Sequence, residues 1–221
     1  MRTAIFIPAR LESHRLPQKH LLKIKECECI AHLIDRVKLT KLPRLIFLCV
    51  PMTLINNKLI DLAERENILW IQGDATDILK RYINATYYWG IDFIVNIDGD
   101  DLFCEPSYID KIIERYLETN CDVVSCKGLP FGVAPLGFTS NALRVLVREG
   151  KGGDTGWGKL FTENTDFNRE IIQAEPKHNH PEMRLSLDTI DDFQKFSYIF
   201  EKLYKPDKVF SLDEIIKLYE V

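Results

Sequence analysis

The chain has 221 residues, of which 46% are hydrophobic and 28% are charged, and its formal net charge is −4 at neutral pH. This length suits one α/β domain, and the composition excludes collagen-like, disordered and disulfide-scaffold proteins. The slightly negative balance disfavours nucleic acid as the main partner, because the neutralisation of phosphates dominates that kind of affinity.

Neither an export signal nor a membrane segment is predicted. The N-terminal apolar run ends at Pro8 and Arg10, so it is too short for a signal peptide, and no later run reaches the length of a membrane span. Of the six cysteines, Cys27 and Cys29 form one close pair, but no second pair follows at zinc-ligand spacing. We therefore expect a soluble, cytoplasmic protein with reduced thiols and no membrane partner.

Strands and helices are predicted to alternate in the first half of the chain. Apolar runs rich in β-branched residues indicate buried strands at residues 3–7, 45–50, 68–71, 92–97 and 122–126. Apolar residues at helical spacing indicate helices at residues 29–38, 54–66, 76–88 and 106–119. This alternation predicts βαβ units, and hence a single α/β domain whose mainly parallel, Rossmann-like sheet is flanked by helices.

The second half of the chain is predicted to be less regular. Between residues 130 and 180 the periodic pattern weakens and glycines cluster, which indicates a loop-rich functional region. A short strand at residues 185–187 and helices at residues 190–204 and 212–219 are expected to follow. Ligands of open parallel sheets bind at the carboxyl ends of strands, so the loops after the strands are the places to look for chemistry.

A basic loop follows the first predicted strand and carries Arg10, Arg15 and Lys19. A nucleoside triphosphate concentrates several negative charges in a small volume, and closely spaced arginine and lysine side chains bind such charges. The loop lacks the glycine-rich Walker pattern, so it is not a P-loop. A solvated basic turn is the alternative, but the position after the first strand favours a phosphate site.

Carboxylates follow two other predicted strands. Asp98, Asp100 and Asp101 come directly after one of them, and Asp188 comes directly after the other. Crowded carboxylates stay ionised most readily when a cation shares their site, and Mg²⁺ prefers one or two carboxylates together with phosphate oxygens and water. Together with the basic loop, aspartates at two strand ends therefore predict a site for a metal ion and a triphosphate.

Helix capping is the alternative for these acids. Asp101 in particular is suited to cap the helix that begins near Pro106. Asp191 and Asp192 lie at the start of the next-to-last predicted helix, where acids interact favourably with the helix dipole. We assign Asp191 and Asp192 to capping and Asp188 to the metal site.

The basic loop, IPARLESHRLPQKHLL, resembles the opening of the sugar-acid cytidylyltransferases, which include the 3-deoxy-manno-octulosonate (KDO) and acylneuraminate cytidylyltransferases. The segments VNIDGDDLFCEP and LSLDTIDDF resemble later motifs of the KDO enzymes, in the same order. Two further segments, GDATDILKRY and PFGVAPLGFTSNAL, are more similar to the cytidylyltransferase-like proteins of spore-coat polysaccharide biosynthesis. The resemblance extends over essentially the whole chain and implies a Mg²⁺-dependent nucleotidyltransferase that uses CTP.

The resemblance also implies roles for matching positions. Nucleotide contacts are implied for Pro8, Ala9, Arg10, Ser13, Arg15, Lys19, Asp77, Asp98 and Gly99. Catalytic roles are implied for Arg10, Lys19, Asp100 and Asp188, with Asp100 and Asp188 as the Mg²⁺ ligands. The glycine-rich stretch at residues 152–164 has no counterpart in the family motifs. Our candidates for acceptor binding come from this stretch, with an ordinary turn around a packed tryptophan as the alternative: Gly153, Asp154, Trp157, Lys159 and Glu163.

Three positions depart from the family pattern. Gln18 stands where a glycine is usual, His20 where a proline is usual, and Asp98 where the KDO enzymes have glutamine. We expect transfer of CMP from CTP to a small acidic sugar or related acceptor other than KDO, with release of pyrophosphate, in the synthesis of surface polysaccharide or glycoconjugate precursors. Relatives of this type imply a homodimer. Two alternatives stay open: a metal-dependent glycosyltransferase of related fold, and a non-catalytic nucleotide-binding homologue, which the three departures favour.

Overall fold

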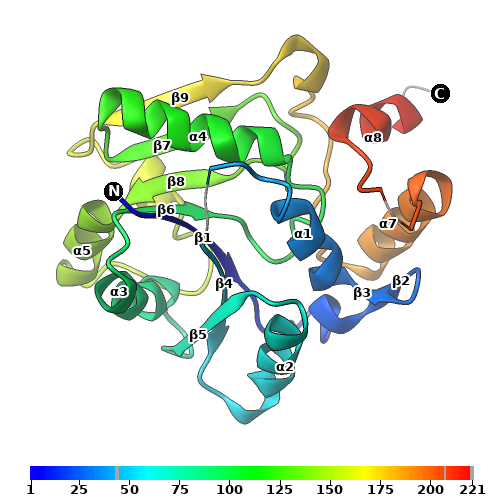
Figure 1. Cartoon of the computed structure of the whole chain (residues 1–221), viewed down its shortest axis with the longest axis horizontal. Helices are drawn as coiled ribbons and strands as arrows, with labels where there is room; N and C mark the ends of the chain where they lie inside the picture. Colours follow the sequence, from blue (N-terminus) through cyan, green and yellow to red (C-terminus); the bar gives the residue numbers. More distant parts are fainter. Residues whose placement is uncertain (43–44, 207, 220–221) are drawn as a thin grey trace.

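The computed structural model describes residues 1–42, 45–206 and 208–219. Within these residues a seven-stranded sheet has the strand order β5-β4-β1-β6-β8-β7-β9 (Figure 1). The strands are β1 (Thr3–Pro8), β4 (Leu45–Pro51), β5 (Leu69–Gly73), β6 (Phe93–Asn96), β7 (Val123–Lys127), β8 (Leu136–Thr139) and β9 (Arg169–Gln173). Only the two pairings of β8, with β6 and with β7, are antiparallel in this sheet. The predicted mainly parallel α/β fold is confirmed.

Helices cover both faces of the sheet, which explains why the central strands are apolar on both sides. Ile5 and Ile7 of β1 face a core that is shared with α1 (Cys29–Val37), α2 (Asn57–Arg65) and α4 (Pro106–Thr119). The alternate residues, Ala4 and Phe6, face a second core shared with α3 (Ile78–Trp89), α5 (Ser140–Arg148) and α6 (Lys159–Thr162). This alternation along β1 places the sheet between two helical layers.

The C-terminal helices α7 (Ile190–Leu203) and α8 (Leu212–Tyr219) pack beside this sandwich over a third apolar cluster, at one end of the molecule (Figure 1). Asp213 at the start of α8 ties this helix to the short helix η3 (Pro176–His178). Its carboxylate accepts hydrogen bonds from Lys177 Nζ at 2.8 Å and from His178 Nε2 at 2.5 Å. The bond from Lys177, followed by that from His178, holds the pKa of Asp213 below its usual range.

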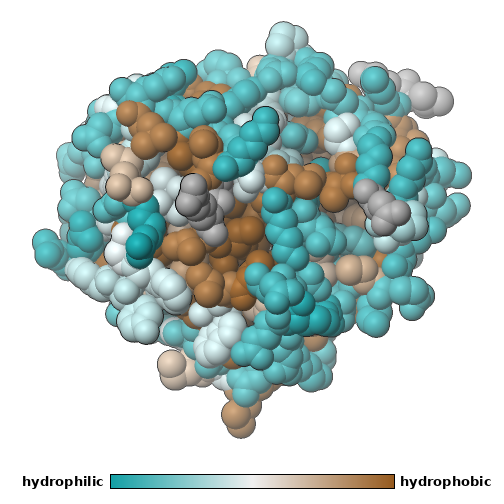
Figure 2. Space-filling view, viewed as in Figure 1, coloured by the Kyte–Doolittle hydropathy of each residue, from teal (hydrophilic) through white to brown (hydrophobic). Residues whose placement is uncertain are grey.

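Polar side chains cover most of the face shown in Figure 2, while hydrophobic groups gather toward its centre. The amphipathic helices agree with this pattern: α5 buries Ala142, Leu143 and Leu146 and turns its other side outward. Across the described ranges, no helix combines the length and the apolar character that a bilayer crossing needs.

The second half of the chain contains several short elements. In residues 130–180, predicted to be loop-rich, β8, α5, α6, β9 and η3 are separated by loops. The predicted strand at residues 185–187 is wrong, because this segment does not join a sheet ladder. It runs extended between two loops instead: Leu185 N donates to Phe131 O at 2.7 Å, and Leu187 N donates to Asp100 O at 2.9 Å. The predicted helix at residues 54–66 is divided into η2 (Leu54–Asn56) and α2.

Two capping predictions have different outcomes. The cap of α4 is Glu105, whose side chain accepts a hydrogen bond from Ser107 N, so the capping role considered for Asp101 is wrong. Asp192 forms a reciprocal capping box with Thr189 at the start of α7, as predicted for the acids there. The acids after β6 therefore need an explanation other than helix capping.

Candidate active site

The loops that follow β1 and β6 meet at the carboxyl edge of the sheet. The two strands are parallel neighbours, and beyond them Gly99 N donates a hydrogen bond to Pro8 O at 3.1 Å. A β-carbon on Gly99 would lie only 2.7 Å from Pro8 O and 3.0 Å from His20 Cε1. Glycine at this position therefore permits the acidic loop to lie directly against the basic loop.

An open pocket of ≈ 780 Å³ lies where these loops meet, a volume in the usual range for small-molecule sites. Its lining includes most of the residues selected from the sequence: Pro8, Ala9, Arg10, Ser13, Arg15, Lys19, Asp98, Gly99, Asp100, Asp154, Trp157 and Asp188. Four candidates are not among the lining residues: Asp77, Gly153, Lys159 and Glu163.

Lys19 is the centre of an ionic network in this pocket. Its Nζ atom lies 2.5 Å from Asp100 Oδ2 and 3.1 Å from Asp188 Oδ1. Two further cations contact Asp188: Arg15 Nη2 at 2.8 Å from Oδ1 and Arg184 Nη2 at 2.5 Å from Oδ2. The chain thus brings together a basic loop near its start and two carboxylates from distant parts of the sequence.

Burial and the charges in the pocket shift the pKa values of Asp188 and Asp98 in opposite directions. Burial alone would raise the pKa of Asp188, but Lys19, Arg184 and Arg15 outweigh it and hold that pKa below its usual range. Asp98 reaches the solvent of the pocket but is otherwise enclosed by protein. Desolvation, followed by the charge of Asp100, raises the pKa of Asp98 to about 6. Asp188 is therefore held as an anion at neutral pH.

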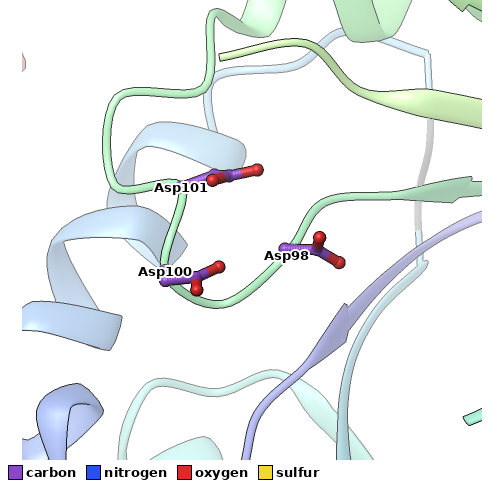
Figure 3. A group of neighbouring side chains, drawn as sticks. All are labelled: Asp98, Asp100 and Asp101. Carbon is purple, nitrogen blue, oxygen red and sulfur yellow. The ribbon is translucent and has the colours of Figure 1, made fainter. Parts of the chain in front are cut away.

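The acidic loop after β6 offers a set of oxygen ligands. Carboxylate oxygens of Asp98, Asp100 and Asp101 lie within 4.8 Å of one another, and Figure 3 shows the three side chains projecting to the same side of the loop. The Lys19 ammonium between Asp100 and Asp188 shows that a positive charge is accommodated there. An all-oxygen donor set of this kind fits a hard divalent cation such as Mg²⁺.

The glycine-rich segment contacts both the pocket and the helical layer behind it. Asp154 forms an ion pair with Arg10. Gly153 O accepts a hydrogen bond from Ile78 N at 3.1 Å, which attaches the segment to the first turn of α3. Trp157 is 6% exposed and packs in the core beside α3 while its surface borders the pocket.

Asp77, predicted to contact nucleotide, is not among the residues that line the pocket, and its side chain caps a helix. It is the N-cap of α3, where its Oδ1 accepts a hydrogen bond from Lys80 N at 3.1 Å. A β-carbon on Gly152 would lie 2.5 Å from its carboxylate oxygens, so the glycine-rich segment passes directly over the cap. Lys159 and Glu163 lie in α6 and at its C-terminal cap.

Two departures from the family pattern have a structural explanation. Gln18 has a φ of 52°, in the left-handed region that glycine favours, so it keeps a backbone conformation that suits the usual glycine. The ring of His20 lies against Gly99 and is only 3% exposed. Burial, followed by the charge of Lys19, lowers the pKa of His20 to about 3, so the imidazole is neutral.

Arg184 and Phe131 are site residues that the sequence did not indicate. The Arg184 guanidinium lies 4.8 Å from the centre of the Phe131 ring while it contacts Asp188. Arg184 precedes Asp188 by four residues in an extended segment, and no local pattern marks it. The bridge between Arg184 and Phe131 places the arginine beside a residue that lines the pocket.

The chain was compared with known proteins. Residues 4–221 match the profile of a family described as cytidylyltransferase. An uncharacterized protein of Methanocaldococcus jannaschii is 29% identical over 201 residues, which make up 89% of this chain and 82% of that protein. The spore coat polysaccharide biosynthesis protein SpsF of Bacillus subtilis is 20% identical, over 96% of this chain and 91% of its own. A solved cytidylyltransferase from Leptospira borgpetersenii has a similar fold, with a TM-score of 0.88 and 21% identity, over 100% of this chain and 94% of that one. This chain belongs to the cytidylyltransferase family of nucleotidyltransferases.

Proposed function

We propose that this cytidylyltransferase transfers CMP from CTP to a sugar acid or a related small acidic acceptor and releases pyrophosphate. The observation that carries the proposal is the position of Lys19 Nζ, 2.5 Å from Asp100 and 3.1 Å from Asp188. This position supports the proposal that the cations and the carboxylates contact the same ligand in one pocket. The similarity to SpsF supports a role in the synthesis of surface polysaccharide or glycoconjugate precursors.

The basic loop is proposed to bind the triphosphate. Arg10, Arg15 and Lys19 line the same pocket, and each is paired with a carboxylate. Arginine offers paired donors and lysine a point charge, which together suit phosphate oxygens. In the complex, phosphate oxygens replace the carboxylate partners of Arg10 and Arg15.

Asp100 and Asp188 are proposed to hold Mg²⁺. When bound, Mg²⁺ supplies a Lewis acid that offsets charge on the α-phosphate and on the attacking oxygen. Arg10 and Lys19 stabilise the charge that develops on the leaving pyrophosphate. The protein makes no covalent bond in this scheme, so its contribution is the positioning of reactants and the neutralisation of charge.

The acceptor is proposed to bind between the glycine-rich segment and the Arg184 side of the pocket. Asp154 and Trp157 of the glycine-rich segment line the pocket. Arg15 and Arg184 both contact Asp188 and supply the positive charge that an acidic acceptor requires. Acceptor roles for Gly153, Lys159 and Glu163, a cytoplasmic location and a homodimer stay predictions.

A pyrophosphate-release screen tests the proposal. Each nucleoside triphosphate is incubated with Mg²⁺ and a panel of acidic sugars, and CTP is expected to react with at least one of them. Asp100→Asn should lower turnover by about a hundredfold or more, with an unchanged circular dichroism spectrum. The matched control is Asp61→Asn on the exposed side of α2, which should retain full turnover.

Three results would refute the proposal. Near-normal turnover of Asp100→Asn would remove the central assignment. Stabilisation of the wild type by CTP without pyrophosphate release from any acceptor would favour a nucleotide-binding protein without catalysis. Transfer of a sugar from a nucleotide sugar, with CTP inert, would identify a glycosyltransferase.

A further inference from the structure

Asn56 connects the basic loop to the neighbouring strand-end loop after β4. It lies at the end of η2 and is 0% exposed, although it carries a polar side chain. Its Oδ1 accepts a hydrogen bond from Leu11 N at 2.9 Å. Its Nδ2 donates to both carboxylate oxygens of Glu12 at 3.0 Å and to Thr53 Oγ1 at 2.7 Å. One side chain thus holds the main chain and a side chain of the basic loop.

The chemistry of these contacts requires a primary amide. The Leu11 N–H can only donate a hydrogen bond, and the ionised Glu12 carboxylate can only accept one. A single buried side chain that serves both must carry an acceptor and a donor side by side, as asparagine does. Burial alone would raise the pKa of Glu12, but the hydrogen bonds from Asn56 and Thr53 outweigh it and hold that pKa below its usual range. Glu12 is therefore an anion that accepts hydrogen bonds from Asn56 and Thr53.

The contacts of Asn56 fix a short stretch of backbone between two pocket residues. Leu11 and Glu12 directly follow Arg10 and precede Ser13, both of which line the pocket, whereas Asn56 is not among the lining residues. Leu11 itself is 2% exposed, so its side chain is anchored in the core. With the Leu11 amide and the Glu12 carboxylate both held by Asn56, the backbone that aims Arg10 toward the pocket has little freedom.

We propose that Asn56 is a positioning residue of the nucleotide site, which holds the basic loop in the conformation that binds the triphosphate without touching it. This inference rests on the proposed function, because Arg10 acts on the nucleotide only if the pocket binds CTP. Loss of the hydrogen bonds from Asn56 to Leu11 and Glu12 releases the loop, so the affinity for nucleotide falls while the fold remains.

A double-substitution cycle with a compensating pair tests this inference. Asn56→Asp places a second carboxylate against Glu12 and removes the donor, whereas Glu12→Gln supplies a donor from the loop. Asn56→Asp is therefore expected to raise the Kd for Mg²⁺–CTP by about tenfold, the size of one lost charge-assisted hydrogen bond. Glu12→Gln alone should change Kd little, because glutamine still offers Asn56 an acceptor. The double variant Asn56→Asp/Glu12→Gln should regain the wild-type Kd.

The neighbouring residue provides a matched control. Asn57→Asp makes the same chemical change on an exposed side chain that pairs with Gln72 and does not contact the basic loop. Its Kd should equal that of the wild type. Hydrogen exchange of the Leu11 amide is measured in all variants without nucleotide, and it should be faster in Asn56→Asp and slow again in the double variant.

The outcomes separate the inference from the proposed function. Unchanged exchange at Leu11, or an unchanged Kd in a folded Asn56→Asp protein, would overturn the role of Asn56. A purely structural role would lower the free energy of unfolding of Asn56→Asp and leave the Kd of the folded protein as it was. In another outcome, the wild type fails to bind Mg²⁺–CTP while hydrogen exchange of the Leu11 amide becomes faster in Asn56→Asp as expected. That result refutes the proposed function, but it leaves intact the conclusion that Asn56 holds the basic loop.

Discussion

Replacement of Lys19 by methionine isolates the charge at the centre of the site, because methionine keeps most of the apolar stem and loses the ammonium. Lys19 is 8% exposed, and its two partners are mostly buried, with side-chain exposures of 22% for Asp100 and 13% for Asp188. Removal of one partner from a buried ion pair typically costs about 3–5 kcal/mol. Because this pocket is open to solvent, we expect Lys19→Met to lower the free energy of unfolding by about 2–3 kcal/mol in EDTA.

Mg²⁺ should restore much of that loss. Without the ammonium, the carboxylates of Asp100 and Asp188 repel each other, and a divalent cation can take its place between them. Binding at a hundredfold excess over Kd stabilises the folded state by about 2.7 kcal/mol. The stability of Lys19→Met should therefore depend much more strongly on Mg²⁺ than that of the wild type. Turnover should still fall about a hundredfold or more, because Lys19 is proposed to stabilise the leaving pyrophosphate as well.

Urea unfolding in EDTA and in saturating Mg²⁺ measures both effects. The matched control is Lys58→Met on the exposed side of α2, which should unfold like the wild type under both conditions. If Lys19→Met has wild-type stability in EDTA, or if Mg²⁺ stabilises it no more than the wild type, Lys19 does not neutralise these carboxylates and the metal assignment fails.

Three further outcomes are expected. Asp154→Asn removes the ion-pair partner of Arg10 and leaves the guanidinium free for phosphate. The Kd for Mg²⁺–CTP, measured by calorimetry, should therefore fall about threefold, which corresponds to the free energy of one partly exposed ion pair. A higher Kd would show that Asp154 itself contacts the nucleotide. Gly99→Ala forces a β-carbon to within 2.7 Å of Pro8 O, so the loops must separate, and kcat/KM should fall at least tenfold while helix content is unchanged in circular dichroism. The pKa of Asp213 is lower in the folded than in the unfolded protein, so its ionised carboxylate stabilises the fold. This stabilisation is complete above the unfolded-state pKa of about 4 and is lost as the pH falls through the lower folded-state pKa. Urea titrations below about pH 4 should therefore show a shallower loss of stability in Asp213→Asn than in the wild type, and parallel curves would contradict this.

The strands found from sequence are those whose apolar residues are continuous, and the missed strands lack that pattern for physical reasons. In β8, Gly137 has no side chain because a β-carbon would lie 2.4 Å from Ile112 Cγ2. The strand therefore looks like a glycine-containing loop. In β9, at the edge of the sheet, Ile171 is 52% exposed, so the burial that makes a strand recognisable is weak. Leu185 and Leu187 led to the opposite error, a predicted strand that is absent, because their buried side chains lie on a segment that bonds to loops instead of a sheet.

The candidate site was predictable to the extent that its residues are adjacent in the sequence. The basic loop and the acidic loop each carry several charges at a strand end, which is a local pattern. Arg184 lies against Phe131 and Asn56 is bonded to Leu11, both far away in the chain, and nothing near either residue in the sequence marks it. Their proposed roles follow only from the packing of one loop against another.

Each of Arg10, Arg15 and Lys19 in the basic loop is paired with a carboxylate, and this pairing affects which ligands the pocket favours. The paired charges balance one another, so a lone anion such as inorganic phosphate would gain little in the pocket, because it must displace an acid that then remains without a counterion. A lone metal ion would face the converse cost, because Lys19 lies between the two proposed metal ligands, Asp100 and Asp188. If the proposed function holds, a magnesium–triphosphate complex would satisfy both sets of side chains at once, and the site is expected to favour the complete complex over either of its parts.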